Sequence, residues 1–187
     1  NVHYMFENEV AAAGITVEIV SAGPPDIVPA LARGDVDAGA MFPSFYAGAK
    51  EVLGDAYQEI PVDSYGTHFI LVATQEMIDE NPDVVTAVLA SLYAGEQVVI
   101  SDPAASHQSV SNVLGGTLTP DDVAAASVNY NFNMQLNQAM LELMVDEGAW
   151  IIERGSIEGE PPTVESIAPF IDGSFLSGID ASRVTLE

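Results

Sequence analysis

Apolar positions follow two alternating periods along the first 62 residues of the chain. In three segments the apolar residues recur at helical spacing, and a glycine follows each segment directly. These segments are 2–13, 26–33 and 44–53. Three short apolar runs lie between and after these segments and predict strands: 16–20, 36–42 and 57–62. The resulting α-β-α-β-α-β order is typical of a parallel sheet flanked by helices, so we expect an α/β fold.

The pattern becomes mainly helical after residues 69–74, which form the most strand-like run of the chain. Pro82 opens a helix that should reach about residue 100, and a second helix should span residues 104–114. Thr119 and Pro120 supply the cap and first residue of a third helix. A fourth is marked by Leu136, Met140, Leu143 and Met144 and should end at Gly148 or soon after, and a short helical piece is expected near 164–168.

Charge narrows the range of partners. The chain has 28 acidic and 4 basic residues, for a formal net charge of -24. Such a charge repels phosphate backbones and anionic lipid headgroups, so neither nucleic acid nor a membrane surface is an expected partner. It suits a saline or marine medium, where self-repulsion is screened. We find no apolar run of the roughly 18 residues that a membrane span needs.

Residues suited to catalysis are few. The absence of cysteine excludes disulfides, thiolate zinc sites and a cysteine nucleophile. Ser44, His3 or His68, and Asp63 could form a triad on paper, but no G-x-S-x-G motif frames a serine. Metal, nucleotide and dinucleotide motifs are also absent, so no cofactor is expected. The sequence therefore favours a small-molecule-binding protein over an enzyme.

Residues 14–18 and 26–38 carry a family pattern. They read G-I-T-V-E and D-I-V-P-A-L-A-R-G-D-V-D-A, which resembles the type II periplasmic substrate-binding proteins. The likeness is greatest to the NMT1/THI5-like family of ABC-transporter receptors, which includes taurine, aliphatic sulfonate, nitrate and thiamine-pyrimidine binders. Residues 80–85 and the near-terminal I-D-G-S-F-L of 171–176 are consistent with that family.

The resemblance implies two lobes with the ligand in the cleft between them. Residues 1–67 would form most of the second lobe, a three-layer α/β unit with a parallel-dominated sheet. Residues 68–187 would supply a crossover strand and the helical C-terminal part of the first lobe, whose own sheet would lie upstream of Asn1. We therefore expect the chain to begin in mid-protein at Asn1, as a processed or partial product.

The function implied by the resemblance is the solute-binding component of an ABC importer. Its solute would be a sulfonate, taurine, nitrate or a pyrimidine-like nitrogenous compound, and its partner the ABC permease. Such a receptor would be a monomer, periplasmic or extracellular, either secreted or lipid-anchored. The alternative is an enzyme like the pyrimidine-synthesis relatives that are consumed as a histidine donor. Those relatives use a cysteine-containing motif, which this chain lacks.

The candidate binding residues come from topology, since ligands of α/β folds bind beyond the carboxyl ends of strands. Two predicted strands end in the loops 21–25 and 41–45. The N-terminus of the first helix favours an anion, and two further residues flank the presumed hinge. The candidates are therefore Asn1, His3, Ser21, Gly23, Phe42, Ser44, Phe45, Tyr65 and His68.

Each candidate also has a structural interpretation. Phe42 and Phe45 suit a core as well as a planar ligand, and a helix N-terminus often binds only water. The cations Arg33 and Lys50 are expected on helices away from the cleft edge. This placement favours a neutral, zwitterionic or aromatic nitrogenous solute.

Overall fold

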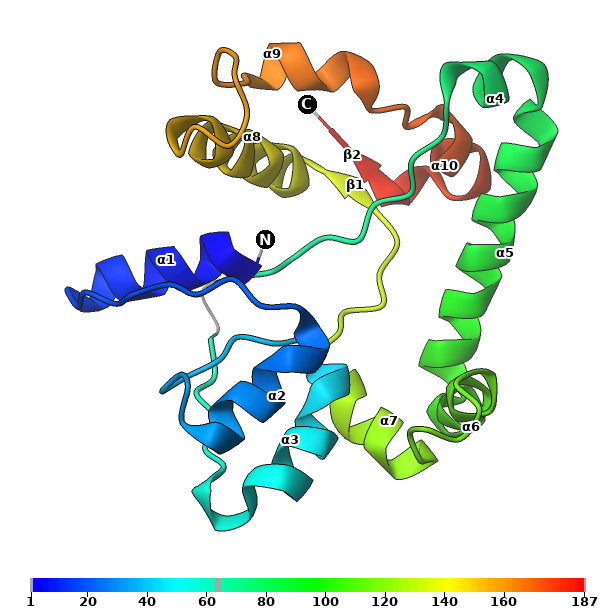
Figure 1. The fold of residues 1–187 in the computed structure, drawn as a ribbon. Coiled ribbons are helices and arrows are strands. Elements are labelled where there is room, and N and C mark those ends of the chain that lie inside the picture. The colour runs from blue at the N-terminus through cyan, green and yellow to red at the C-terminus, as the bar shows by residue number, and fades with distance from the viewer. Residues whose placement is uncertain (1, 63–64, 187) are drawn as a thin grey trace. The chain divides into compact units, whose positions relative to one another are not determined.

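The computed structural model describes residues 2–62 and 65–186 of the chain. The chain divides into two compact units, coloured by residue number in Figure 1. The first unit takes its residues from 1–67 and 106–131, and the second from 68–105 and 132–187. Each unit is described by itself below.

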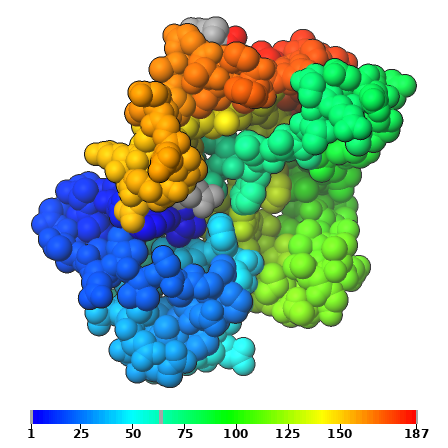
Figure 2. All heavy atoms as spheres, turned by 45° about the horizontal axis from the view of Figure 1, so that its top comes forward, coloured from blue at the N-terminus to red at the C-terminus, as the bar shows by residue number. Residues whose placement is uncertain are grey.

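The first unit is built from helices joined by irregular segments. Its elements are α1 (Val2–Ala13), α2 (Pro24–Arg33), η1 (Pro43–Phe45), α3 (Tyr46–Leu53), η2 (Gly54–Ala56), α6 (Pro103–Val113, within this unit from Ser106) and α7 (Pro120–Ser127). Helices α2 and α3 pack side by side, as Figures 1 and 2 show in blue and cyan. Ala49 of α3 and Val123 of α7 are its buried apolar side chains among the described residues.

The second unit is also mainly helical. Its elements are α4 (Gln75–Glu80), α5 (Pro82–Ser101), β1 (Leu136–Asn137), α8 (Gln138–Glu153), α9 (Val164–Ile167), η3 (Ala168–Phe170), α10 (Ser174–Ile179), η4 (Ala181–Arg183) and β2 (Val184–Thr185). Helix α5 contacts α4 and α10, and α8 contacts α9. Met140, Leu141 and Leu176 form its buried apolar core. Helices therefore make up most of the regular structure of the described second unit, and its assignment to a first lobe stays a prediction.

The helix boundaries follow the predicted caps. Helix α2 begins with Pro24 and ends at Gly34, whose φ of 72° is left-handed and whose N–H bonds the carbonyls of Ala30 and Leu31. Glycine adopts this conformation without the steric cost that a Cβ adds. At α7, the Thr119 side chain accepts from the Asp122 N–H, and Asp122 accepts from the Thr119 N–H. The C-terminal end of α2 and the N-terminal start of α7 were predicted from the sequence, and both are confirmed.

The predicted strands are corrected by the structure. The segments 16–20, 36–42, 57–62 and 69–74 pair with no other strand in the described part of the chain. A strand needs a neighbour to satisfy its backbone hydrogen bonds, and an apolar run shows only a preference for extended backbone. Apolar side chains are exposed in the segments 16–20 and 69–74, as in Phe69 at 74% and Val72 at 78%. The described residues are thus mainly helical with one two-stranded parallel sheet, which is compatible with an α/β fragment, and the expected parallel-dominated sheet of a three-layer lobe does not form among the described residues of 1–67.

A small parallel sheet forms elsewhere. Strands β1 and β2 pair in parallel, with Leu136 opposite Val184 and Asn137 opposite Thr185. Leu136 was expected to lie in a helix, but α8 begins two residues after it. The Asn137 side chain explains this start, because it accepts a 2.8 Å hydrogen bond from the Met140 N–H and so caps α8.

Helix α8 does not end at Gly148 itself, the first of the expected positions, but soon after it. The helix continues to Glu153, and a Cβ at Gly148 would lie 2.5 Å from Cγ of Pro162. The glycine therefore lets the segment before α9 approach α8 closely. Arg154 is the C-cap of α8, and Gly155 follows in left-handed conformation at φ 70°.

A buried ion pair joins the C-terminal residues of the second unit to α5. Glu96 is only 7% exposed, and its Oε1 lies 2.8 Å from the Arg183 guanidinium. Its other oxygen accepts a 2.6 Å hydrogen bond from the Met134 N–H. Arg183 also bonds Asp180 and the Asn133 side chain. The carboxylate is thus paired and hydrogen-bonded, as a buried charge must be.

Tyr93 completes this cluster. Its hydroxyl donates a 2.9 Å hydrogen bond to Asp180, and the Arg183 guanidinium lies 5.3 Å from its ring centroid. Hydrogen bonds from Ser182, Tyr93 and Arg183 lower the pKa of Asp180 to about 2. The carboxylate form therefore persists at all but strongly acidic pH.

Helix α5 also qualifies the expectation of no membrane-spanning run. In the described part of the chain it is the one helix that is long and apolar enough to cross a bilayer, judged by length and composition alone. It carries Glu96, however, whose ion pair with Arg183 belongs to the packed second unit. An ionised group inside a bilayer is costly, so composition by itself does not make α5 a membrane span.

Replacing Gly148 by alanine should destabilise the second unit by about 1–3 kcal/mol, because the new methyl group overlaps the rigid Pro162 ring. Urea unfolding followed by circular dichroism measures the change. Gly178→Ala in α10 is the matched control. No atom lies within 4 Å of its added Cβ, so a gain of roughly 0.5–1 kcal/mol is expected. Equal effects from both substitutions contradict the Gly148–Pro162 contact.

Replacing Arg183 by methionine should lower the urea midpoint strongly, because Glu96 is left buried without its counter-charge. Arg154→Met is the control, since it removes the same charge from an exposed residue beside Trp150. If the urea midpoint falls no more for Arg183→Met than for the control, the ion pair of Arg183 does not stabilise the second unit. The double variant with Glu96→Gln should recover part of the loss.

Candidate ligand-binding site

The loop before α3 positions the polar groups of the candidate site. Phe42 is extended, at φ -74° and ψ 150°, and its carbonyl accepts a 2.9 Å hydrogen bond from the Phe45 N–H. Pro43 opens the short helix η1, a position that suits a residue with fixed φ and no N–H. Ser44 and Tyr46 follow at the start of the helical run, and Lys50 lies one turn beyond Tyr46.

A pocket of about 360 Å³ lies between this helical run and α7. Figure 1 shows α7 next to the start of α3, and α7 contacts η1. All of the lining residues belong to the first unit, and they come from three stretches of chain. They are Pro43, Ser44, Tyr46, Ala47 and Lys50; Glu59; and Leu118, Asp122, Ala125, Ala126, Val128 and Asn129.

Lys50 and Glu59 form an ion pair at the pocket. The Lys50 ammonium lies 3.5 Å from Oε2 of Glu59 and 5.3 Å from the centroid of the Tyr57 ring. The Tyr57 hydroxyl donates a 3.1 Å hydrogen bond to the same Glu59 oxygen. Both charged side chains are about half exposed, so water weakens their attraction. A ligand can compete with Lys50 for Glu59.

Two tyrosines near this pair hold their protons strongly. Burial and the hydrogen bond to Glu59 raise the pKa of Tyr57 to about 12. Burial, followed by the charge of Glu59, raises the pKa of Tyr46 as well. Both phenols are therefore neutral at physiological pH, and the Tyr46 hydroxyl is available to a ligand as a donor or an acceptor.

Asp122 places a second carboxylate on the opposite wall. Its Oδ2 accepts hydrogen bonds from the Thr119 N–H at 3.0 Å and from the Thr119 hydroxyl at 2.7 Å. These bonds lower the pKa of Asp122, so it is ionised at neutral pH. The same contacts that start α7 thus fix a negative charge at the pocket.

The arrangement is suited to binding. Its volume falls in the range of small-molecule sites, which combine apolar walls with a few converging polar groups. Alanines from α3 and α7 supply the apolar surface, and the polar groups are a hydroxyl, a phenol, an ammonium, an amide and two carboxylates. No histidine or cysteine lines the pocket in the described part of the chain.

Only Ser44 among the predicted site residues lines this pocket. Phe42 and Phe45 lie beside it and are half-buried, as the structural interpretation of these aromatics allows. Ser21 and Gly23 are exposed ahead of α2, where Gly23 occupies the cap position. They line neither this pocket nor the hollow on α5, and their role in ligand binding stays a prediction.

The other candidates lie elsewhere. His3 is half-buried on α1, with Nε2 3.2 Å from a Glu7 oxygen. Tyr65 packs on α1, its ring centroid 5.8 Å from that of Tyr4. His68 is exposed in the second unit. Asn1 lies outside the described residues.

Sequence reasoning missed most of the pocket. Lys50 was expected away from the site, yet it lines the pocket with Tyr46, four residues earlier on the same helix. That spacing places two side chains on one helix face and could have indicated the pairing. The contribution of α7 had no such indication, because residues 120–127 were assigned to the other lobe. Only the fold brings Asp122 to the same pocket.

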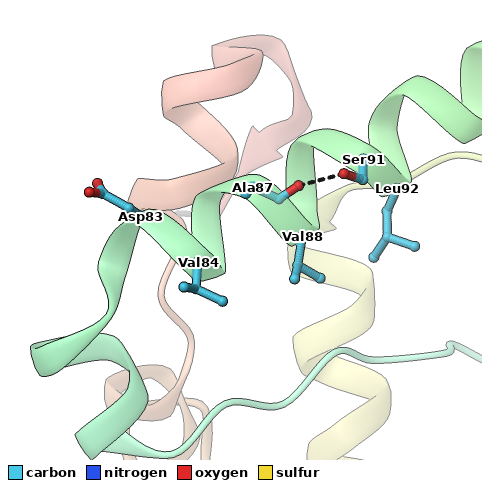
Figure 3. A pocket seen from close by; sticks show the side chains of 6 residues that line it. All are labelled: Asp83, Val84, Ala87, Val88, Ser91 and Leu92. Atoms are coloured by element: carbon cyan, nitrogen blue, oxygen red, sulfur yellow. Dashed lines mark hydrogen bonds between the residues drawn. The ribbon is translucent and has the colours of Figure 1, made fainter.

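A second hollow of about 460 Å³ lies on α5 in the second unit. Figure 3 shows Val84, Val88 and Leu92 pointing the same way from the helix, while the Ser91 hydroxyl bonds the Ala87 carbonyl at 2.7 Å. Asp83 is the one charged residue of its lining in the described chain. Because few polar groups converge there, we regard the α3–α7 pocket as the candidate ligand site.

Comparison with known proteins identifies the family. The model of the family described as NMT1/THI5 like matches residues 3–106, more than half of the chain. The chain therefore belongs to the NMT1/THI5-like family, as its residues 14–38 suggested. No curated protein and no solved structure matches it. The family match includes α3 and its pocket residues but ends before α7.

Replacing Glu59 by glutamine should move the pKa of Tyr57 from about 12 back toward 10, because it removes the charge beside the phenol. The ultraviolet absorbance of phenolate on alkaline titration measures this, with Tyr57→Phe identifying the Tyr57 component. Since the folded-state pKa is raised, the stabilising effect of Tyr57 is complete below pH 10 and is lost as the pH rises to about 12. An unchanged late-titrating component contradicts the Tyr57–Glu59 contact.

Proposed function

We propose that this protein is the extracytoplasmic solute-binding component of an ABC importer. It binds a small organic solute and presents it to the permease of the transporter. Membership of the NMT1/THI5-like family supports binding of a small solute and association with a transporter. The observation that carries the proposal for this chain is the α3–α7 pocket with its converging polar groups.

The chemistry of the pocket favours binding over turnover. Nucleophilic catalysis needs a nucleophile within hydrogen-bond reach of a base. Ser44 is the one serine in the described lining, no histidine lines the pocket there, and His3 is held by Glu7 on α1. The lining groups can orient and retain a molecule without any of them reacting with it.

An enzyme related to pyrimidine synthesis is the second candidate, because the family also includes such enzymes. That chemistry consumes a histidine of the protein and uses a cysteine-containing motif in the relatives. This sequence has three histidines and no cysteine. We therefore rank the receptor function first.

The proposed location follows from the proposed role. A receptor that delivers solutes to an importer works outside the cytoplasmic membrane, in the periplasm or at the cell surface, and is secreted or lipid-anchored. The net charge of -24 supports a saline exterior, where salt screens repulsion between receptor molecules and between like charges of one chain.

A thermal-shift screen of the full-length protein tests the receptor function. The panel contains taurine, methanesulfonate, nitrate, pyrimidines and aliphatic amines, each over a range of concentrations. A solute at 100 times its Kd should stabilise the protein by about 2.7 kcal/mol, which is a rise in Tm of roughly 5–10 °C. The rise should saturate, and the bound solute should be recovered unchanged. Conversion of a solute to product, without saturable stabilisation by any, contradicts the receptor function.

A further inference from the structure

The charges around the α3–α7 pocket distinguish between classes of solute. The described lining carries two carboxylates, Glu59 and Asp122, and one ammonium, that of Lys50. The first unit as a whole has many more acidic than basic residues, since Arg33 and Lys50 are its only cations in the sequence. Its field therefore attracts cations and repels anions at the pocket.

Both carboxylates keep an oxygen for a ligand. The hydrogen bonds to Asp122 end on Oδ2, and those to Glu59, with its ion pair, end on Oε2. Among the described residues, Oδ1 of Asp122 and Oε1 of Glu59 accept no side-chain hydrogen bond. An ionised carboxylate oxygen is an acceptor only, so it selects a group that donates N–H or O–H bonds.

The single ammonium of the pocket is already neutralised. Lys50 is paired with Glu59 and lies over the Tyr57 ring, so an anionic solute would have to displace an existing partner. A cationic solute replaces Lys50 at Glu59 and gains Asp122 as a second partner. The Tyr46 ring adds an aromatic face, which attracts cations, and the alanines of α3 and α7 accommodate an aliphatic chain.

We propose that the α3–α7 pocket binds a small organic cation that carries N–H donors on an aliphatic chain, such as an amine or a guanidine. This inference rests on the proposed receptor function and specifies its solute. Glu59 and Asp122 hold the cationic group or groups, and Ser44, Tyr46 and Asn129 bind the polar remainder. Lys50 acts as an internal competitor that occupies Glu59 until the solute enters.

Replacing Lys50 by methionine tests this directly, because the two solute classes respond in opposite directions. The probes are butylamine, putrescine and guanidine as cations, and methanesulfonate and nitrate as anions. Affinities are measured by calorimetric titration of the full-length protein at low salt. Without the competing ammonium, cation affinity should rise roughly 3- to 10-fold, as expected for one unit charge removed from a few ångströms away in water.

Arg33→Gln is the matched control. It removes one positive charge from the same unit, but Arg33 is paired with Asp35 and does not line the pocket. The control should change cation affinity less than 2-fold, because salt and water screen a more distant exposed charge. Glu59→Gln is the second variant, and it should weaken cation binding because it removes one of the two carboxylates.

The outcomes separate the two proposals. Tighter cation binding by Lys50→Met alone supports the cation site. Binding of an anion that Lys50→Met weakens overturns the cation class and leaves the receptor function standing. Cation binding that responds equally to Lys50→Met and Arg33→Gln overturns the pocket as its site. No binding of any probe or any solute of the wider panel overturns both proposals.

Discussion

Arg183 holds the buried carboxylate of Glu96, and the contacts of the second unit are arranged around that ion pair. The guanidinium also bonds Asp180 and Asn133 and lies over the Tyr93 ring, while Glu96 accepts from the Met134 N–H. These bonds form one hydrogen-bond and ion-pair network, which joins α5, the segment just before β1 and the C-terminal turn. The two paired strands begin just after residues of this network, and Leu136 lies opposite Val184 in parallel pairing.

Positively charged residues are scarce in the chain, and this determines the contacts of Lys50 in the first unit. With 4 basic residues against 28 acidic ones in the chain, Arg33, Lys50 and Arg183 each pair with a carboxylate. Lys50 meets Glu59 at the mouth of the α3–α7 pocket, half exposed to water, where the pair is weak and exchangeable. Arg183 meets Glu96 out of water, where the pair is structural. Burial therefore separates a cation that stabilises the fold from one that a ligand can displace.

Local features of the sequence predicted the helices well. Gly34 ends α2 in the left-handed conformation, and Thr119 caps α7 with Asp122, because caps depend on residues within one turn. Strand pairing depends on a distant partner, so residues 16–20 and 69–74 were wrongly assigned to a sheet. Gly148 was taken as one possible end of its helix, because its contact with Pro162 cannot be seen in either segment alone.

The candidate site divides in the same way. Ser44 was found from the loop that precedes a helix, and the family from residues 14–38, since both are continuous in sequence. Tyr46, Lys50 and Glu59 required the turn of α3, and Asp122 required α7 to pack beside η1. Because α7 had been assigned to another lobe, no spacing rule could have joined Asp122 to Lys50.

Chemical-shift mapping by nuclear magnetic resonance locates the bound solute, which we propose lies between α3 and α7. Isotope-labelled protein is titrated with the solute that stabilises it most. We expect saturable shifts of the backbone amides of Ser44, Tyr46, Lys50 and Asn129, with α5 unaffected. Shifts confined to Val84, Val88 and Leu92 of α5, with the α3 and α7 amides unchanged, would contradict it.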